Sequence, residues 1–484
     1  MNWFADIALQ IWPPIVLVLF LVMPARRAVV GALIASWLFL PQHFIEVTFV
    51  PNLTKVSATS YALLFGALLL DPRRSIFNFR PVWTDIPMGL FMFSGFLSSL
   101  FNGLGTYDAF SMLLDRFVQY GIPYLMGRSY FQTAADCKEL CLGILLGGLV
   151  YVPLCAYEIR MSPQLHAIFY GAAPFSDFKM AVRWGGFRPS VFMQHGLMVG
   201  VWMATACATS FWLWRTRAVE KFLWMPMWAI FWGLLVTTVL VKATGAIVLL
   251  FGVIGIMYFL INLRSKLPFA AVLVVIPSYL FIRTTGLWDG IAFSEWLGTQ
   301  VSPDRAASLW YRLTMENETV GRMTNRGMFG WGGWGRAFDF TFDLKGVPTL
   351  IVPDSFWIVT FGSNGYYGLI TVFLFYLLGP AVLLYKLTHR EWADPRYAPI
   401  TGIAIVSLLY ALDCLFNAMV NPIFIVMLGA VSGMAARLER KPASAASPAK
   451  PAAKPASKPV VRTARTASER YLPPGRPQPS EGRP

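Results

Sequence analysis

The sequence predicts an all-α integral membrane protein of about 12–13 transmembrane helices, with a large periplasmic loop domain and a disordered cytoplasmic C-terminal tail. Three observations predict this fold class. Hydrophobic residues make up 56% of the 484 residues and charged residues only 13%, which exceeds the apolar share of soluble domains. The apolar residues lie in runs too long for soluble helices. Basic residues recur in alternate loops between these runs.

Thirteen apolar runs follow one another along the chain. Each is expected to be helical, because a segment that crosses lipid must satisfy its backbone hydrogen bonds internally. A span needs about 20 residues, so the second and third runs are short. The runs lie near 8–24, 28–41, 58–71, 86–101, 112–130, 139–158, 190–213, 223–241, 244–263, 268–282, 365–387, 398–416 and 420–437.

The distribution of Lys and Arg predicts the orientation of the chain. Seven alternate loops carry basic residues, from Arg26 and Arg27 after the first run to Arg437 after the last. Cytoplasmic loops of membrane proteins carry an excess of such residues. We therefore expect the amino terminus in the periplasm, the carboxyl terminus in the cytoplasm, and the two long stretches 159–189 and 283–353 outside.

These boundaries divide the chain into four expected parts. Residues 1–282 form an N-terminal helix bundle that includes the outer loop 159–189, and residues 283–353 form an outer cap. Residues 354–437 form the C-terminal transmembrane helices. The tail, 438–484, is rich in Ala, Pro, Ser and Lys, carries ten basic and three acidic residues, and should be disordered. Tail and loops account for the net charge of +15, so nucleic-acid binding is not expected.

The first candidate site is the stretch from Arg183 to Arg188, Arg-Trp-Gly-Gly-Phe-Arg, directly before a central span. Two arginines separated by glycines allow guanidinium and backbone groups to approach one anion, and Arg matches phosphate oxygens. The alternative is a pair of interfacial arginines that reach lipid phosphates. His195, one turn into the span, is either functional or a packing histidine bonded to a backbone carbonyl. We expect His166 to be exposed in a loop.

The second cluster lies in the outer cap. Arg312 is on a predicted helix, Arg322 and Arg326 are one turn apart and share a face, and Gly330–Gly335 forms a glycine-rich turn. A lipid-borne pyrophosphate is the anion that outer arginines beside a membrane would bind. Some of these arginines are expected to be salt-bridged instead, because acids and bases balance in the cap.

The third element is Asp354, where the cap returns to the membrane. A carboxylate beside an apolar face can serve as a general base, or it can cap the helix that begins there. Within the runs, Asp115, Arg116 and Asp413 should face the protein interior or a wet cavity.

No metal or cofactor is expected. Asp339 and Asp343 lack further ligands, and the five cysteines, which should be reduced and apolar, have no spacing typical of zinc sites.

At these elements the chain resembles the O-antigen ligase and O-antigen polymerase superfamily of bacterial envelope enzymes. Arg183–Pro189 is similar to the family's Arg-x-x-Gly-Phe-x-x-Pro stretch, and Arg312 to the arginine early in its large loop. Gly330–Gly335 is similar to its Gly-x-Gly segment. Residues 354–368 are similar to its His-Asn block, which ends in Gly-x-x-Gly. The resemblance covers roughly 60–437 in layout and only these stretches in detail.

The resemblance implies a multi-pass enzyme of the bacterial inner membrane. It would transfer a glycan from an undecaprenyl-pyrophosphate-linked oligosaccharide donor to an acceptor glycan, without a metal and with inversion. Arg183, Arg188 and Arg312 would hold the pyrophosphate, with Arg322 and Arg326 as further candidates. Membrane lipids, a chain-length regulator and a flippase are the other expected partners.

One departure from the family pattern affects the expected base. The ligases carry His where this chain has Pro353 before Asp354. Either Asp354 or His195 is then the base, or the chain is a polymerase of O-antigen or exopolysaccharide, which we favour over a ligase joining glycan to lipid A core. The alternative of another class is a lipid-linked glycan flippase or a polysaccharide exporter. Flippases typically show broken helices.

Overall fold

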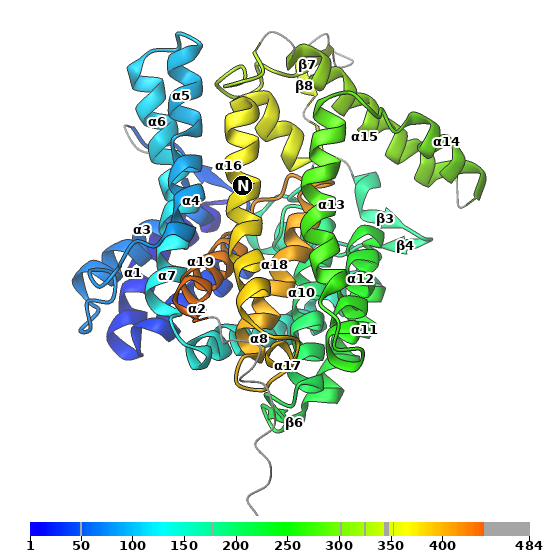
Figure 1. Ribbon diagram of the computed structural model, residues 1–484. Coiled ribbons are helices and arrows are strands. Elements are labelled where there is room, and N and C mark those ends of the chain that lie inside the picture. The colour runs from blue at the N-terminus through cyan, green and yellow to red at the C-terminus, as the bar shows by residue number, and fades with distance from the viewer. Residues whose placement is uncertain are drawn as a thin grey trace, which may run out of the picture. The chain divides into compact units, whose positions relative to one another are not determined.

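Each of the thirteen apolar runs contains a helix in the computed structural model of the protein, which is mostly helical (Figure 1). The structure describes residues 1–48, 51–175, 178–300, 303–323, 326–342, 348–351 and 353–439. The predicted tail therefore lies outside the described residues from 440 onward.

The helices of the first half come in close succession. They are α1 (Trp3–Val22), α2 (Ala25–Phe39), α3 (Lys55–Leu69), α4 (Ile86–Met92), α5 (Ser94–Phe101), α6 (Thr106–Arg116), α7 (Ile122–Tyr130), α8 (Ala134–Met161) and α9 (Leu165–Tyr170). Two short turns of 3-10 helix, η1 (Trp83–Asp85) and η3 (Phe178–Ala181), and a π-helical turn, η2 (Phe117–Gly121), accompany them.

The second half contains longer helices. They are α10 (Gly196–Arg215), α11 (Met227–Leu240), α12 (Thr244–Asn262), α13 (Leu267–Thr284), α14 (Ile291–Gln300), α15 (Pro303–Arg322), α16 (Phe356–Lys386), α17 (His389–Trp392), α18 (Ala398–Asp413) and α19 (Pro422–Arg437).

Seven helical segments among the described residues are long and apolar enough to cross a membrane, by length and composition. They are α1, the segment Trp83–Phe101 (η1, α4 and α5), α8, α10, α12, α13 and α16. Four further apolar helices, α3, α11, α18 and α19, are shorter. This pattern is consistent with an all-α membrane protein, and the expected total of 12–13 spans stays a prediction.

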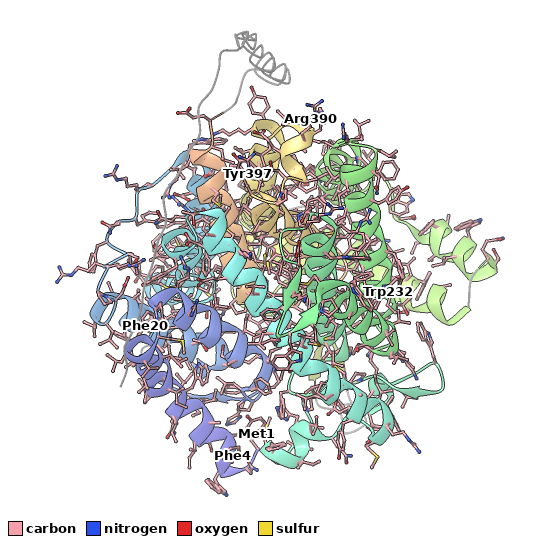
Figure 2. All side chains as sticks on the ribbon, turned by 90° about the horizontal axis from the view of Figure 1, so that it is seen from below. Met1, Phe4, Phe20, Trp232, Arg390 and Tyr397 are labelled. Atoms are coloured by element: carbon pink, nitrogen blue, oxygen red, sulfur yellow. The ribbon has the colours of Figure 1, made fainter. Side chains whose placement is uncertain are left out.

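The helices differ in how much of their surface is buried. α10 is almost entirely enclosed, whereas α1, α12 and α13 expose most of their length. Their exposed side chains are large and apolar, for example Leu21, Val248 and Val274. Figure 2 shows α1, marked by Phe20, and α11, marked by Trp232, on opposite sides of the bundle. Exposed apolar surface of this extent indicates contact with lipid.

Four small antiparallel hairpins qualify the prediction of an all-α fold. The strand pairs are β1 (Phe44–Ile45) with β2 (Leu53–Thr54), β3 (Val182–Arg183) with β4 (Gly186–Phe187), β5 (Lys221–Phe222) with β6 (Met225–Pro226), and β7 (Asp339–Phe342) with β8 (Pro348–Ile351). Their strands are too short to form a recognisable hydropathy pattern. The hairpins depend instead on the residues in their turns. Positive φ at Trp184 and Gly185 suits the tight turn of the β3–β4 hairpin.

One end of the bundle carries most of the structure outside the predicted spans. Figure 1 shows α14, α15 and the β7–β8 hairpin together at this end, and α17 and β6 at the opposite end. The segment that carries Arg188 and the start of α10 lies toward the first end, since the charges of Arg312 on α15 and of Asp354 act on His195, the cap residue of α10. We call this the cap end.

Candidate functional site

The two arginines of the first predicted cluster flank the β3–β4 hairpin. Arg183 ends β3 and its guanidinium is partly exposed, whereas Arg188 follows β4 and is buried. The backbone N–H of Arg188 donates to the carbonyl of Ala181 at 2.7 Å. The hairpin therefore fixes where both side chains begin.

A buried carboxylate that the sequence analysis did not select holds the neighbouring backbone. Glu158, near the end of α8, is 0% exposed. One of its oxygens accepts from the N–H groups of Gln164 and Leu165 at 3.0 and 2.8 Å. The other accepts from Ser190 and Val191 at 2.9 and 2.7 Å. Hydrogen bonds to a charged acceptor are the strong ones, so Glu158 fixes the segment between Arg188 and His195.

His195 is the residue that caps α10. Its Nδ1 accepts from the backbone N–H of Leu197 at 3.2 Å, and its Nε2 lies 3.3 Å from a guanidinium nitrogen of Arg188. Both ring nitrogens thus face donors, and protonation would set N–H groups against them. Burial and the Arg188 charge lower the pKa of His195 to about 4. The expected bond to a backbone carbonyl is therefore not formed, and the functional role of His195 stays a prediction. A base that resists protonation is a poor proton acceptor.

Two glycines let the cations approach this segment closely. A Cβ at Gly196 would lie 2.7–2.9 Å from Cγ, Cδ and Nε of Arg188, so the Arg188 side chain runs directly over the first residue of α10. A side chain at Gly186 would collide with the ammonium group of Lys242, in the α11–α12 turn. Lys242 therefore adds a further cation beside the hairpin.

Arg312 of α15 contacts the predicted base directly. Its Nε lies 3.0 Å from a carboxylate oxygen of Asp354, whose side chain is 56% exposed. Asp354 does not cap α16: the residue at the cap position is Ser355. The capping alternative is therefore wrong, because the Asp354 carboxylate is turned toward α15.

A buried ion pair holds α15 in this position, and the sequence analysis missed it. Arg283, at the end of α13, and Glu316 of α15 are 1% and 4% exposed in their side chains and lie 2.9 Å apart. Glu316 also accepts from the Ser355 hydroxyl at 2.5 Å and from the Trp357 indole at 3.3 Å. Burial raises the pKa of Glu316. The pair connects α13, α15 and the start of α16, which carry Arg312 and Asp354.

The structure brings five of the predicted site residues together at the cap end. The charges of Arg188, Asp354, Arg183 and Arg312 all act on the imidazole of His195. The Arg312 charge also acts on Asp413, which is buried at the end of α18 and accepts from the Asn417 amide at 2.6 Å. Three segments that lie far apart in the sequence thus bring their charges within range of this imidazole, and Arg312 contacts the exposed carboxylate of Asp354. We call Arg183, Arg188, His195, Arg312 and Asp354 the cap-end cluster.

Arg322 and Arg326 have different partners from the cap-end cluster. Arg322, the last residue of α15, pairs with Asp339 of β7. Arg326 donates to Asn102 and stacks 4.7 Å from the ring centroid of Trp331. Arg322 is therefore salt-bridged, as expected for some arginines of the cap, whereas the partners given for Arg326 are an amide and an indole ring.

The glycine-rich turn after Arg326 packs against a break in α16. Gly365 has φ +63° and ψ −161° inside this helix, a backbone conformation essentially restricted to glycine. The N–H groups of Trp331 and Gly332 donate to the carbonyls of Gly362 and Ser363 at 2.9 and 3.1 Å. The N–H groups of Tyr366 and Tyr367 donate back to Gly327 and Met328 at 2.7 and 3.0 Å. The turn thus replaces hydrogen bonds that the break removes from the helix.

A side chain from α6 completes this joint. Arg116 donates to the amide oxygen of Asn364 at 2.9 Å and lies over the rings of Phe91 and Tyr120. It immediately precedes the π-helical turn η2, a feature that often marks functional positions. The expectation that Asp413 faces the interior is confirmed by its burial, and Arg116 is partly buried against other helices.

One expectation about a histidine is wrong. His166 is buried, not exposed: its Nδ1 lies 2.6 Å from the carbonyl of Ala172 and its Nε2 accepts from the N–H of Gln42 at 3.1 Å. Burial lowers the pKa of His166. Its position on the short helix α9, which the sequence did not reveal, turns it inward.

The described residues contain no group of three or more His, Cys, Asp or Glu side chains placed to hold a metal ion. Asp339 is paired with Arg322, and Asp343 lies outside the described residues. All five cysteines are buried and unpaired, as predicted.

Comparison with protein-family models gives no match, and comparison with curated protein sequences gives none either.

Proposed function

We propose that this chain is a membrane glycosyltransferase that polymerises a surface polysaccharide at the periplasmic face of the bacterial inner membrane. The donor would be a glycan on undecaprenyl pyrophosphate, and the acceptor a sugar hydroxyl of the growing glycan. The cap-end cluster carries this proposal, because three arginines and one exposed carboxylate converge where a lipid-linked diphosphate would reach the bundle surface.

Four residues of the cap-end cluster have a role in this reaction. Arg183, Arg188 and Arg312 bind the diphosphate oxygens and stabilise the charge that develops on the leaving group. The bond between the anomeric carbon and the phosphate oxygen breaks, and a bond to the acceptor oxygen forms on the opposite face of the sugar. The acceptor proton passes to Asp354, and the diphosphate leaves as an anion on its lipid. No metal is required, since the guanidinium groups supply the positive charge.

The ion pair between Arg312 and Asp354 couples donor binding to proton transfer. In the free protein Arg312 holds the carboxylate at 3.0 Å. A bound diphosphate competes for the same guanidinium and releases the carboxylate toward the acceptor. Asp354 is favoured as the base over His195, because both nitrogens of His195 face donors.

An apolar groove offers a path for the isoprenoid chain. It has a volume of about 390 Å³ and lies between α13 and α16, with Leu273, Phe281 and Ile370 among its lining residues. Tyr366, which follows the break in α16, also lines it. The groove thus runs along the bundle from the level of the joint between cap and helix.

The break in α16 favours the alternative of a transporter, because broken helices are typical of transporters. In transporters the freed backbone groups coordinate ions or substrate. Here the carbonyls of Gly362 and Ser363 accept from the cap, and the N–H groups of Tyr366 and Tyr367 donate to it. These four groups are therefore engaged in holding the cap, which supports the transferase over the flippase or exporter.

The test uses purified protein in nanodiscs with lipid-linked repeat units and no membrane potential. We expect the wild-type protein to produce a ladder of longer glycans. Arg312→Ala and Arg183→Ala should each lower elongation by about 100-fold, since hydrogen bonds to charged groups contribute roughly 1.5–3 kcal/mol apiece. Arg396→Ala is the matched control, because this arginine pairs with Asp394 in the loop at the opposite end.

Each other outcome has a distinct meaning. Normal ladders from both cap-end variants contradict the proposed site. A single transfer to lipid A core without a ladder identifies a ligase. No transfer by the wild-type protein, with movement of the lipid-linked glycan across a vesicle bilayer, identifies a flippase.

A further inference from the structure

A large cavity lies away from the cap-end cluster. It has a volume of about 870 Å³ and is bounded by the end of α1, the starts of α2 and α8, and the segments after α3 and α7. Glu139 lies near the start of α8 and Glu158 near its end. This cavity therefore lies at the opposite end of the bundle from the cap-end cluster, the end that the basic loops assign to the cytoplasm.

An apolar groove continues from this cavity along the bundle surface. It has a volume of about 520 Å³ and lies between α2 and α8, with Leu142, Leu146 and Val150 among its lining residues. Leu146 and Val150 are exposed, although they are apolar. Arg27 and Glu139 line both the cavity and the groove. The polar cavity and the apolar groove are therefore one continuous depression.

Glycines shape this groove in two ways. A side chain at Gly143 would collide with Val30 and Ile34, so its absence lets α2 and α8 approach closely. Gly31 lines the groove as well, and a Cβ added there would meet no atom within 4 Å. The space beside Gly31 is open and wide enough for a chain that the protein does not itself supply.

The carboxylates that line the cavity are already engaged. Asp136 and Glu139 both pair with Arg26, and Asp136 also accepts from the N–H groups of Gln132 and Thr133. Asp71 accepts from the backbone N–H groups of Arg73 and Ser75 and from the hydroxyl of Tyr130. Their negative charges are thus offset within the protein.

Two arginines of the cavity retain donors for a ligand. The Arg27 side chain is 65% exposed and its nearest carboxylate oxygen, on Glu139, is 3.6 Å away. Arg73 is exposed, and among the described residues its guanidinium forms no ion pair. Guanidinium groups match phosphate oxygens. The cavity therefore presents unfilled donors for an anion, and one of the two arginines, Arg27, also lines the apolar groove.

We propose that this depression binds one anionic glycerophospholipid of the membrane. Its phosphate contacts Arg27 and Arg73 in the polar cavity, and one acyl chain lies along α2 and α8 in the groove. A free phosphate would leave the groove empty, and a zwitterionic phospholipid would bring a cation of its own that offsets its phosphate charge beside the two arginines. Cations beside an apolar groove favour a lipid that has both a negatively charged headgroup and an acyl chain. This site is independent of the proposed transferase activity.

The experiment is native mass spectrometry of the full-length protein, titrated in detergent with phosphatidylglycerol or phosphatidylcholine. We expect one phosphatidylglycerol per protein, bound at least about tenfold more tightly than phosphatidylcholine. Gly31→Leu, whose Cβ would meet no protein atom within 4 Å and whose side chain would occupy the groove, should abolish this binding. Gly252→Leu is the matched control, because Gly252 lies in the middle of exposed α12 and also has nothing within 4 Å of an added Cβ. It should bind like the wild-type protein.

A second variant tests the headgroup contact. Arg27→Gln should weaken phosphatidylglycerol binding by about tenfold and phosphatidylcholine binding by less, since it removes charge and keeps the groove. Equal affinity for the two lipids in the wild-type protein overturns the proposal, and so does unaltered binding by Gly31→Leu. Binding of inorganic phosphate with the same affinity as the lipid would show that the groove has no part.

Discussion

Replacement of Glu158 by Gln should loosen the segment that carries Arg188 and His195. The four N–H groups around Glu158 divide evenly between its two oxygens. Glutamine keeps one oxygen and sets an NH₂ group against two of the donors. Two hydrogen bonds to a charged acceptor are then lost, at roughly 1.5–3 kcal/mol each, so the variant should be less stable by about 3–6 kcal/mol. That is a large part of a typical free energy of unfolding, about 5–15 kcal/mol.

The assay is thermal unfolding in detergent, combined with limited proteolysis mapped by mass spectrometry. Glu158→Gln should lower the midpoint of unfolding, and new cleavage should appear within residues 162–192. Glu295→Gln is the control, because Glu295 is exposed on α14 and such surface changes are usually worth about 0.5 kcal/mol or less. Equal midpoints and equal cleavage patterns for the two variants would refute the role given to Glu158.

Two further predictions concern the start of α10 and the break in α16. The pKa of His195 is lowered to about 4 in the folded protein, below the unfolded value of about 6.5. Its contribution to stability is therefore present above pH 6.5 and is lost as the pH falls toward 4. His195→Asn, which keeps a capping side chain, should flatten the loss of stability between pH 6.5 and 4, measured by thermal unfolding. If the thermal stability of His195→Asn depends on pH as that of the wild-type protein does, the role given to His195 is wrong. Gly365→Ala should destabilise the protein by at least about 3 kcal/mol, because an added Cβ overlaps the backbone of Gly327 and Met328 in a strained conformation. If Gly365→Ala is as stable to heat as the wild-type protein and its cap is as resistant to protease, the packing of the glycine-rich turn on the break in α16 is contradicted.

Most helical segments could be predicted because hydropathy is a local property. The thirteen runs needed only the length and composition of each segment, and a helix lies in each of them. The four hairpins could not be predicted in this way, since each strand has two to four residues. The number of helices that cross a membrane also depends on packing, and seven segments are long and apolar enough on their own.

Part of the candidate site could be predicted from residue type alone. Arginines, a histidine and a carboxylate beside apolar runs are unusual enough to select Arg183, Arg188, His195, Arg312 and Asp354. Their partners depend on contacts between distant segments, for example the 42 residues that separate Arg312 from Asp354. Single acids within helices, such as Glu158 and Glu316, give no such signal. Burial and the convergence of donors from other segments distinguish them, and only the fold reveals both.

The interrupted course of α16 has a consequence for the biogenesis of the protein. The carbonyls of Gly362 and Ser363 find their donors in Trp331 and Gly332, residues that leave the ribosome about thirty positions earlier. A bare carbonyl in hydrocarbon costs several kcal/mol. This helix therefore has all its backbone partners only once the segment Trp331–Gly332 has docked on it. The order of synthesis supplies that segment before the helix that needs it.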